Sequence, residues 1–206
     1  MSTTPLVIDQ AQARTLLAQV DVPLILRKLF RDLAAGQAVQ PAQQLVAFPN
    51  GAGDFINYLG VLAKDGVYGV KTSPYIVREQ GPLVTAWTLL MSMHSGQPLL
   101  LCDAAELTTA RTAAATALAV DALAPAAAQR LAIIGSGKVA QAHLRYVQNL
   151  RDWQQIRLYS PSLGSASAET RAQLASLDPR LSLAASCEAA LEDADVILLC
   201  TSSAGP

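Results

Sequence analysis

Charged residues are scarce in this chain, and no basic cluster is present. Only 15% of its 206 residues are Asp, Glu, Lys or Arg, the net charge is −1, and 51% are hydrophobic. A disordered chain needs more charge and less hydrophobicity, so the composition predicts a folded protein. Electrostatic binding of nucleic acid is not expected at this charge. The length lies between that of one large domain and that of two small ones.

Cysteines are few, and a targeting segment is lacking. Cys102, Cys187 and Cys200 are odd in number and widely spaced in apolar runs, which favours free buried thiols over disulfides or metal ligands. The N-terminus has no basic region followed by a long apolar one, so no signal peptide is predicted. The Ala-rich stretch 112–129 is too weakly apolar to span a bilayer. We expect a cytoplasmic protein with no metal site and no membrane partner.

The first part of the chain predicts helices followed by a sheet. Asp9 and Asp21 are placed to cap two helices. Over 45–101, short apolar runs alternate with Gly, Pro and Asp, which is typical of an antiparallel or mixed sheet. The segment 94–97 between two apolar runs indicates a hairpin turn. A long helix over 106–123 follows, because strong helix formers run there without Gly or Pro.

From Arg130 onward, short apolar strands alternate with helices. Strands are predicted over 131–134, 156–159, 181–183 and 195–200, and helices over 138–150, 166–177 and 187–191. Apolar strands separated by helices predict a parallel sheet covered on both faces. The fold class is therefore α/β, with an α+β domain over 1–125 and a partial Rossmann doubly wound sheet over 126–206.

A G-x-G-x-x-A pattern lies between the first of these strands and the next helix. The first glycine permits a tight turn, the second lets the backbone approach a pyrophosphate, and the alanine lets helix and strand pack closely. The helix N-terminus offers free N–H groups to phosphates. The alternative is a turn that needs glycines for shape only. The residues predicted to bind a dinucleotide are Gly135, Ser136, Gly137, Lys138, Val139 and Ala140.

The end of the second apolar strand bears on the choice of dinucleotide. An NAD site commonly places Asp or Glu there, whereas this chain has Ser160 and Ser162. Their hydroxyls can bond a 2′-phosphate, and Arg157 or Arg171 lies near in sequence. We therefore favour NADP over NAD; a loop that reads neither ribose well is the alternative.

Two cations precede the glycine loop. Lys71 ends a β-type run, and Arg111 lies in an Ala-rich helix of low charge, where a cation needs a dedicated partner. An arginine fork suits a substrate carboxylate, and an internal salt bridge is the alternative. Asp103 and Glu106 fit a capping box at the start of that helix.

Three features follow one another along the chain: Lys71, the E-L-T-x-x-R-T-A-A stretch over 106–114, and the glycine loop. In these features and their order, the chain resembles the ornithine cyclodeaminase/mu-crystallin family from about residue 8 to 206. The resemblance implies that Lys71 is the active-site lysine, that Arg111 holds the substrate carboxylate, and that Thr112 lies close to the nicotinamide. It also implies that Thr201 and Ser202 belong to a loop near the cofactor, and that the first domain binds substrate and forms a homodimer through its sheet.

Two departures from the family bear on the reaction. Gln43 stands where the family usually has an Arg, and Ile56 stands where the cyclodeaminases have a Glu. Cyclisation of ornithine needs an extra acid/base group, whereas reduction of a preformed imine needs fewer groups. The resemblance therefore favours an NAD(P)H-dependent reductase of small cyclic imino acids, Δ1-pyrroline-2-carboxylate or Δ1-piperideine-2-carboxylate. The alternatives are ornithine cyclodeaminase, which releases ammonia, and a non-catalytic mu-crystallin-like protein that binds the cofactor.

By the same resemblance, the family's catalytic Asp and the rest of its Rossmann sheet would lie beyond Pro206. We therefore expect a partial protein. Its strand over 195–200 would be an apolar sheet edge, which favours aggregation or pairing.

Overall fold

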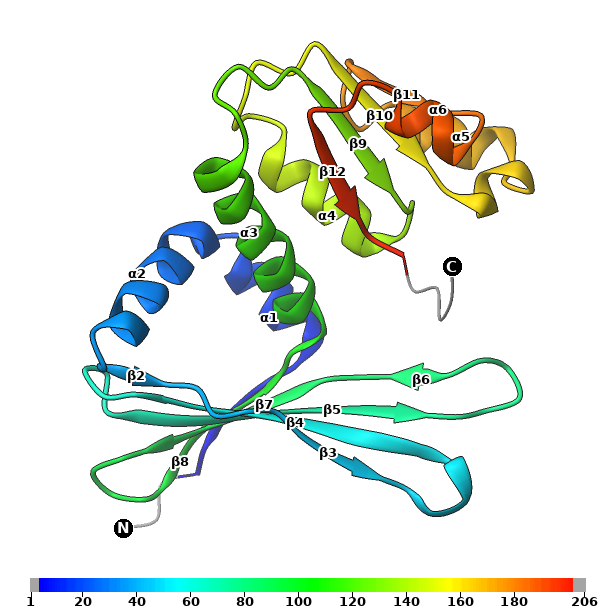
Figure 1. Ribbon diagram of the computed structural model, residues 1–206. Coiled ribbons are helices and arrows are strands. Elements are labelled where there is room, and N and C mark those ends of the chain that lie inside the picture. The colour runs from blue at the N-terminus through cyan, green and yellow to red at the C-terminus, as the bar shows by residue number, and fades with distance from the viewer. Residues whose placement is uncertain (1–3, 202–206) are drawn as a thin grey trace. The chain divides into compact units, whose positions relative to one another are not determined.

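A computed structural model describes residues 4–201 of the chain (Figure 1). The chain divides into two compact units, Met1–Thr108 and Thr109–Pro206. In chain order the elements are β1 (Leu6–Ile8), α1 (Gln10–Leu17), α2 (Val22–Ala34), β2 (Ala38–Val39), β3 (Gln44–Ala47), β4 (Gly53–Leu62), β5 (Val67–Ile76), β6 (Leu83–Val84), β7 (Trp87–Ser92), β8 (Pro98–Asp103), α3 (Ala105–Leu123), β9 (Arg130–Ile134), α4 (Lys138–Val147), β10 (Gln155–Tyr159), α5 (Ala168–Ala175), β11 (Leu181–Leu183), α6 (Cys187–Leu191) and β12 (Val196–Leu199), with short 3₁₀ turns at Pro49–Gly51 and Pro161–Gly164.

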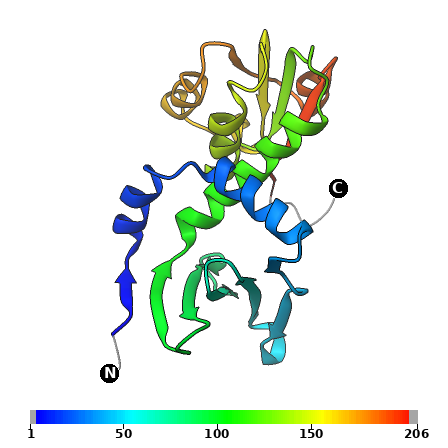
Figure 2. The same cartoon turned by 90° about the vertical axis from the view of Figure 1, so that its left-hand side faces the viewer.

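The first unit is built on a mixed sheet with the order β1-β8-β7-β5-β4-β2, in which β3 also pairs with β4 and β6 with β5. All pairs are antiparallel except β1 with β8, so the predicted mixed sheet is confirmed. The hairpin between β7 and β8 turns at the predicted segment 94–97. Figure 2 shows this sheet from the side, where it is curved rather than flat.

The helices of the first unit begin where the sequence predicts. The Asp9 side chain accepts from the Gln12 backbone N–H at the start of α1, and the Asp21 side chain accepts from the Leu24 N–H at the start of α2. Each cap satisfies an N–H group that the helix itself leaves without a partner. Gly36, with φ of +68°, follows the end of α2.

The second unit contains a parallel sheet with the order β11-β10-β9-β12, which confirms the predicted parallel sheet. The four residues 131–134 of β9 are all buried, so both faces of this strand are covered. The largest side chains under 2% exposed are Trp153, Leu131, Ile133, Leu144, Ile156, Leu158 and Val147. A core of this kind fixes the turn that leads from β9 into α4.

Candidate functional site

The turn from β9 into α4 requires glycine at its first position. Gly135 has φ of +122°, and a Cβ atom there would lie 2.5 Å from the carbonyl oxygen of Cys200. The Gly135 N–H donates to the carbonyl of Tyr159 at 2.7 Å. This backbone therefore lies against the ends of both neighbouring strands, β10 and β12, and any side chain would collide with it.

Gly137 has the opposite surroundings. It is the N-cap of α4, with extended backbone and no side-chain cap, and nothing lies within 4 Å of the place where its Cβ would be. Lys138 and Val139 in the first helical turn are exposed, whereas Ala140 is fully buried. The first N–H groups of α4 therefore face open space beside a lysine, which suits a phosphate group.

Three serine hydroxyls meet beside this turn. Ser160 Oγ lies 2.9 Å from Ser162 Oγ, which in turn lies 3.3 Å from Ser136 Oγ. The structure thus brings together predicted residues from the glycine loop and from the end of β10. Arg157 and Arg171 are the two arginines near these serines in sequence. The Arg157 side chain donates to the backbone carbonyls of Ala189 and Glu192.

In the first unit, Lys71 lies among polar and aromatic groups. Its Nζ is 3.3 Å from Thr108 Oγ1, 3.5 Å from Ser73 Oγ, and 4.4 Å from the centroid of the Tyr58 ring. Tyr58 and Lys71 are directly paired across β4 and β5, which places both on one face of the sheet. The ring face attracts the ammonium group and holds it over the sheet.

A hollow of about 390 Å³ adjoins Tyr58. Its lining is mixed polar and apolar without a charged side chain, and consists of Gln40, Pro41, Ala42, Gln43, Tyr58 and Leu59. Tyr58 is therefore shared between this hollow and the contact with Lys71. Gln43, which stands where the family usually has an Arg, thus lines the same hollow as Tyr58, the residue that contacts Lys71.

Arg111 and Thr112 lie in the part of α3 that belongs to the second unit. Thr108 precedes them by three and four residues, so helical spacing places the three side chains on one face of α3. Arg111 is exposed and forms no ion pair with any residue in the range 4–201, so the internal salt bridge that we considered is not found.

The capping box predicted at the start of α3 is wrong in part. Asp103 Oδ1 accepts from the Ala105 N–H at 2.9 Å, but Glu106 Oε1 accepts from Arg14 Nη2 of α1 at 2.7 Å. A guanidinium is a stronger partner for a carboxylate than a backbone N–H. Glu106 therefore joins α1 to α3 instead of closing the helix end.

Thr201 is exposed and follows β12, whereas Ser202 lies outside the described residues. The three cysteines are free; Cys102 is buried as predicted, but Cys187 and Cys200 are only partly buried. Burial raises the pKa of the Cys200 thiol to about 11. Within residues 4–201, no cluster of metal-ligating side chains is found. No helix there is both long and apolar enough to cross a membrane.

Sequence comparison relates the chain to enzymes of amino-acid metabolism. The profile of the ornithine cyclodeaminase/mu-crystallin family matches residues 8–206. The chain is 70% identical over 203 residues to the NAD(P)H-dependent anabolic L-arginine dehydrogenase DauB of Pseudomonas aeruginosa, which covers 98% of this chain and 64% of that protein. It is 33% identical over 138 residues to an ornithine cyclodeaminase of Brucella abortus, covering 66% of this chain and 38% of that protein.

Solved structures share the fold. The Δ1-pyrroline-2-carboxylate reductase of Thermococcus litoralis, in complex with NADH and L-proline, aligns with a TM-score of 0.83 at 22% identity over 94% of this chain and 61% of that one. A probable ornithine cyclodeaminase from Bordetella pertussis aligns with a TM-score of 0.82 at 26% identity, over 97% and 61%. The chain thus spans less than two thirds of the length of these relatives.

Proposed function

Because the chain belongs to the ornithine cyclodeaminase/mu-crystallin family, we propose that it forms part of an NAD(P)H-dependent oxidoreductase that interconverts an amino acid and its imino acid. L-Arginine is the amino acid that we assign. The observation behind this assignment is the 70% identity to an L-arginine dehydrogenase over nearly the whole chain. In the oxidative direction, L-arginine, NADP⁺ and water give the 2-oxo acid, ammonium, NADPH and a proton, with the imino acid as the intermediate.

The cofactor belongs to the second unit in this proposal. The open space at Gly137 and the exposed first turn of α4 fit a pyrophosphate, and the serine group of Ser136, Ser160 and Ser162 fits a ribose 2′-phosphate. Thr201 and Ser202 would lie near the nicotinamide end. When bound, the cofactor supplies the hydride acceptor or donor. We favour NADP over NAD because the serine group adds no negative charge that would repel the 2′-phosphate.

The substrate belongs to Lys71, Arg111 and Thr112. Arg111, exposed and without an ion pair among residues 4–201, has its fork available for the α-carboxylate. Lys71, held by Tyr58 and Thr108, would exchange a proton with the substrate nitrogen. Thr112 would contact the nicotinamide side. Orientation and charge are then the contributions of the protein to hydride transfer.

The two halves would have separate tasks. We assign substrate binding and dimerisation to residues 1–125 and dinucleotide binding to residues 126–206. A homodimer through the first sheet is supported by its exposed apolar side chains, among them Leu45 at 61% and Val46 at 56% exposed. Light scattering coupled to size-exclusion chromatography measures the mass directly.

Cyclic imino acids remain the second candidate substrate. Ile56, on the Lys71 face of β4, offers an apolar surface instead of an acid/base group, which suits a preformed ring such as Δ1-pyrroline-2-carboxylate. Ornithine cyclodeamination would need the missing group, and ammonia released from ornithine without net formation of NADH would favour it.

The test is turnover by the holoenzyme with a substrate panel. NADP⁺ should be reduced in the presence of L-arginine, and NADPH should be oxidised by the corresponding 2-oxo acid with ammonium. Lys71→Met should lower kcat by about 100-fold or more, as expected for the loss of a general acid/base. Arg78→Met, which removes an exposed cation from the same unit, should change little. Cofactor binding without turnover on L-arginine, ornithine or any cyclic imine would select the non-catalytic alternative.

A further inference from the structure

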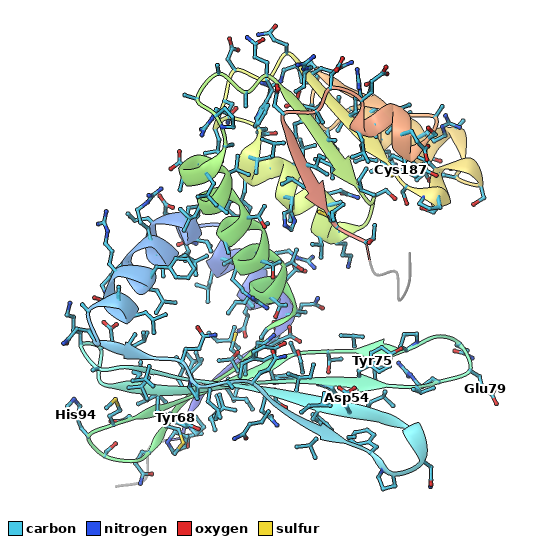
Figure 3. The ribbon with its side chains drawn as sticks, in the orientation of Figure 1. Asp54, Tyr68, Tyr75, Glu79, His94 and Cys187 are labelled. Atoms are coloured by element: carbon cyan, nitrogen blue, oxygen red, sulfur yellow. The ribbon has the colours of Figure 1, made fainter. Side chains whose placement is uncertain are left out.

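Asp54 extends the polar face of the sheet beyond Lys71. In the register of β4 and β5, Tyr58 pairs with Lys71, Ile56 with Ser73, and Asp54 with Tyr75. Residues two apart on a strand lie on the same face, and so do directly paired residues. These six side chains therefore form one continuous surface that ends at Asp54 and Tyr75, which Figure 3 labels on their neighbouring strands.

Asp54 has an incomplete set of hydrogen bonds. Its Oδ1 is the only buried side-chain oxygen or nitrogen within residues 4–201 that has no hydrogen-bond partner. The residue as a whole is half-buried, whereas Oδ1 itself is shielded from solvent. A buried acceptor without a donor is costly, and most proteins avoid it. This carboxylate therefore lacks a donor that a ligand could supply.

The spacing along the strands fits an arginine side chain. The Lys71 ammonium lies 3.5 Å from the Oγ of Ser73, which is two residues along β5 toward Tyr75, and 3.3 Å from Thr108 Oγ1. From Ser73 to Tyr75 the strand rises by about 7 Å at roughly 3.4 Å per residue. An extended arginine spans about 6 Å from its α-carbon to its guanidinium carbon, since it has bonds of about 1.5 Å. A substrate held at Lys71 thus reaches Asp54 with its far end.

The residues in between match the rest of that side chain. Ile56 lies between Tyr58 and Asp54 on this face, and it offers apolar contact to methylene groups. Tyr75, 43% exposed, adjoins Asp54 and offers an aromatic surface on which a guanidinium can stack. Lys71 for the α-nitrogen, Ile56 for the methylene groups and Asp54 for the guanidinium thus follow one another in the order of these groups along L-arginine.

We propose that Asp54 accepts the guanidinium of the substrate and so determines the preference for an amino acid with a cationic end. This inference rests on the proposed function for the substrate class. A planar guanidinium donates two parallel N–H bonds to a carboxylate, which gives both affinity and geometric selectivity. Asp54 is a specificity-determining residue in this account, and it takes no part in hydride or proton transfer.

The experiment compares two ligands that differ in charge. L-Arginine and L-citrulline have nearly the same shape, but the ureido group of citrulline is neutral. Their dissociation constants are measured by titration calorimetry on the NADP⁺-bound holoenzyme, with KM as a second readout. Asp54→Asn should weaken L-arginine binding by about 10- to 100-fold, the contribution of a charge-assisted hydrogen bond, and leave L-citrulline unchanged.

Two further variants complete the test. Glu79→Gln removes an exposed carboxylate from the same unit and should change neither constant. Asp54→Glu keeps the charge and should keep a preference for L-arginine over L-citrulline. This variant tests the inference if Asp54→Asn does not fold. Equal binding of L-arginine by Asp54→Asn and the parent protein would overturn the inference, and so would equal loss of both ligands. If L-arginine binds in an Asp54-dependent way without any NADP⁺ reduction, the proposed activity fails and the Asp54 site stands.

Discussion

The two sheets of this protein differ in how they are covered. In the second unit, large side chains in the parallel sheet and packed around it are almost fully buried, with Leu131 of β9 and Trp153 of the loop before β10 each 1% exposed. In the first unit the buried hydrophobic residues are small ones, namely Ala13, Val22, Ala38, Ala86, Cys102 and Ala104. Leu24 and Phe30 of α2, by contrast, are 63% and 49% exposed.

This difference in burial suggests different contributions of the two units, stability from the second and a binding surface from the first. A sheet buried on both faces has a core of its own, so the second unit can hold a rigid glycine loop. The first unit keeps polar groups and apolar surface open, which suits a substrate face and a subunit contact. The two tryptophans lie one in each unit, Trp87 and Trp153, so intrinsic fluorescence reports on both units together.

The largest expected effect is the loss of a core side chain from the second unit. Trp153→Ala removes a buried indole whose Nε1–H donates to the Val147 carbonyl at 2.9 Å. Such a truncation should lower the free energy of unfolding by about 3–5 kcal/mol, whereas Phe30→Ala on the exposed face of α2 should cost under about 1 kcal/mol. Urea unfolding followed by circular dichroism measures both; similar losses would erase the contrast between the units.

A smaller effect should separate the two glycines of the loop. Gly135→Ala places a methyl group against the Cys200 carbonyl at a positive φ, and should destabilise the second unit by roughly 1–3 kcal/mol. Gly137→Ala meets open space at φ of −72° and should leave the melting temperature nearly unchanged. Thermal unfolding monitored by circular dichroism decides, and an equal shift for the two variants would contradict the assigned surroundings.

The smallest expected effect is on the stability of the fold at acid pH. It concerns the buried residues Asp32 of the first unit and Asp178 of the second. Hydrogen bonds from Lys28, and then from Lys64, lower the pKa of Asp32; a hydrogen bond from Arg180 lowers the pKa of Asp178. A lowered folded-state pKa adds stability that is present above the ordinary carboxyl pKa of about 4 and is lost as the pH falls through the folded value.

Asp32→Asn and Asp178→Asn should therefore be destabilised relative to the parent protein near neutral pH, and this difference should shrink on acidification. Denaturant unfolding followed by circular dichroism measures this difference for each variant. A difference that stayed constant below pH about 4 would show that these carboxylates contribute by shape alone.

Sequence alone predicts the second unit well, because short, mainly apolar strands alternate regularly with helices along the chain. Its glycine loop has local spacing that can be read directly. The first unit is harder. The strands β4 and β5 are ten residues long and partly polar, and β1 has three residues and pairs with β8 far along the chain.

The surroundings of Lys71 depend on that long-range pairing. Tyr58 and Asp54 enter the candidate site through the register of β4 with β5, and a shift of one residue would turn both to the other face. The ion pair of Glu106 likewise could not be predicted from local sequence, since its partner Arg14 lies 92 residues away. A pattern of single residues predicts Lys71 as important, but not which groups hold it.

The central claim is that residues 1–125 bind the substrate and residues 126–206 bind the cofactor, and one calorimetric experiment tests it most directly. NADPH is titrated into the parent protein, Lys71→Met and Gly137→Ala. We predict that Lys71→Met binds NADPH as the parent protein does, whereas Gly137→Ala binds it at least about tenfold more weakly, because its methyl group occupies the approach of the pyrophosphate. Weakened NADPH binding by Lys71→Met, with unchanged binding by Gly137→Ala, would contradict the account.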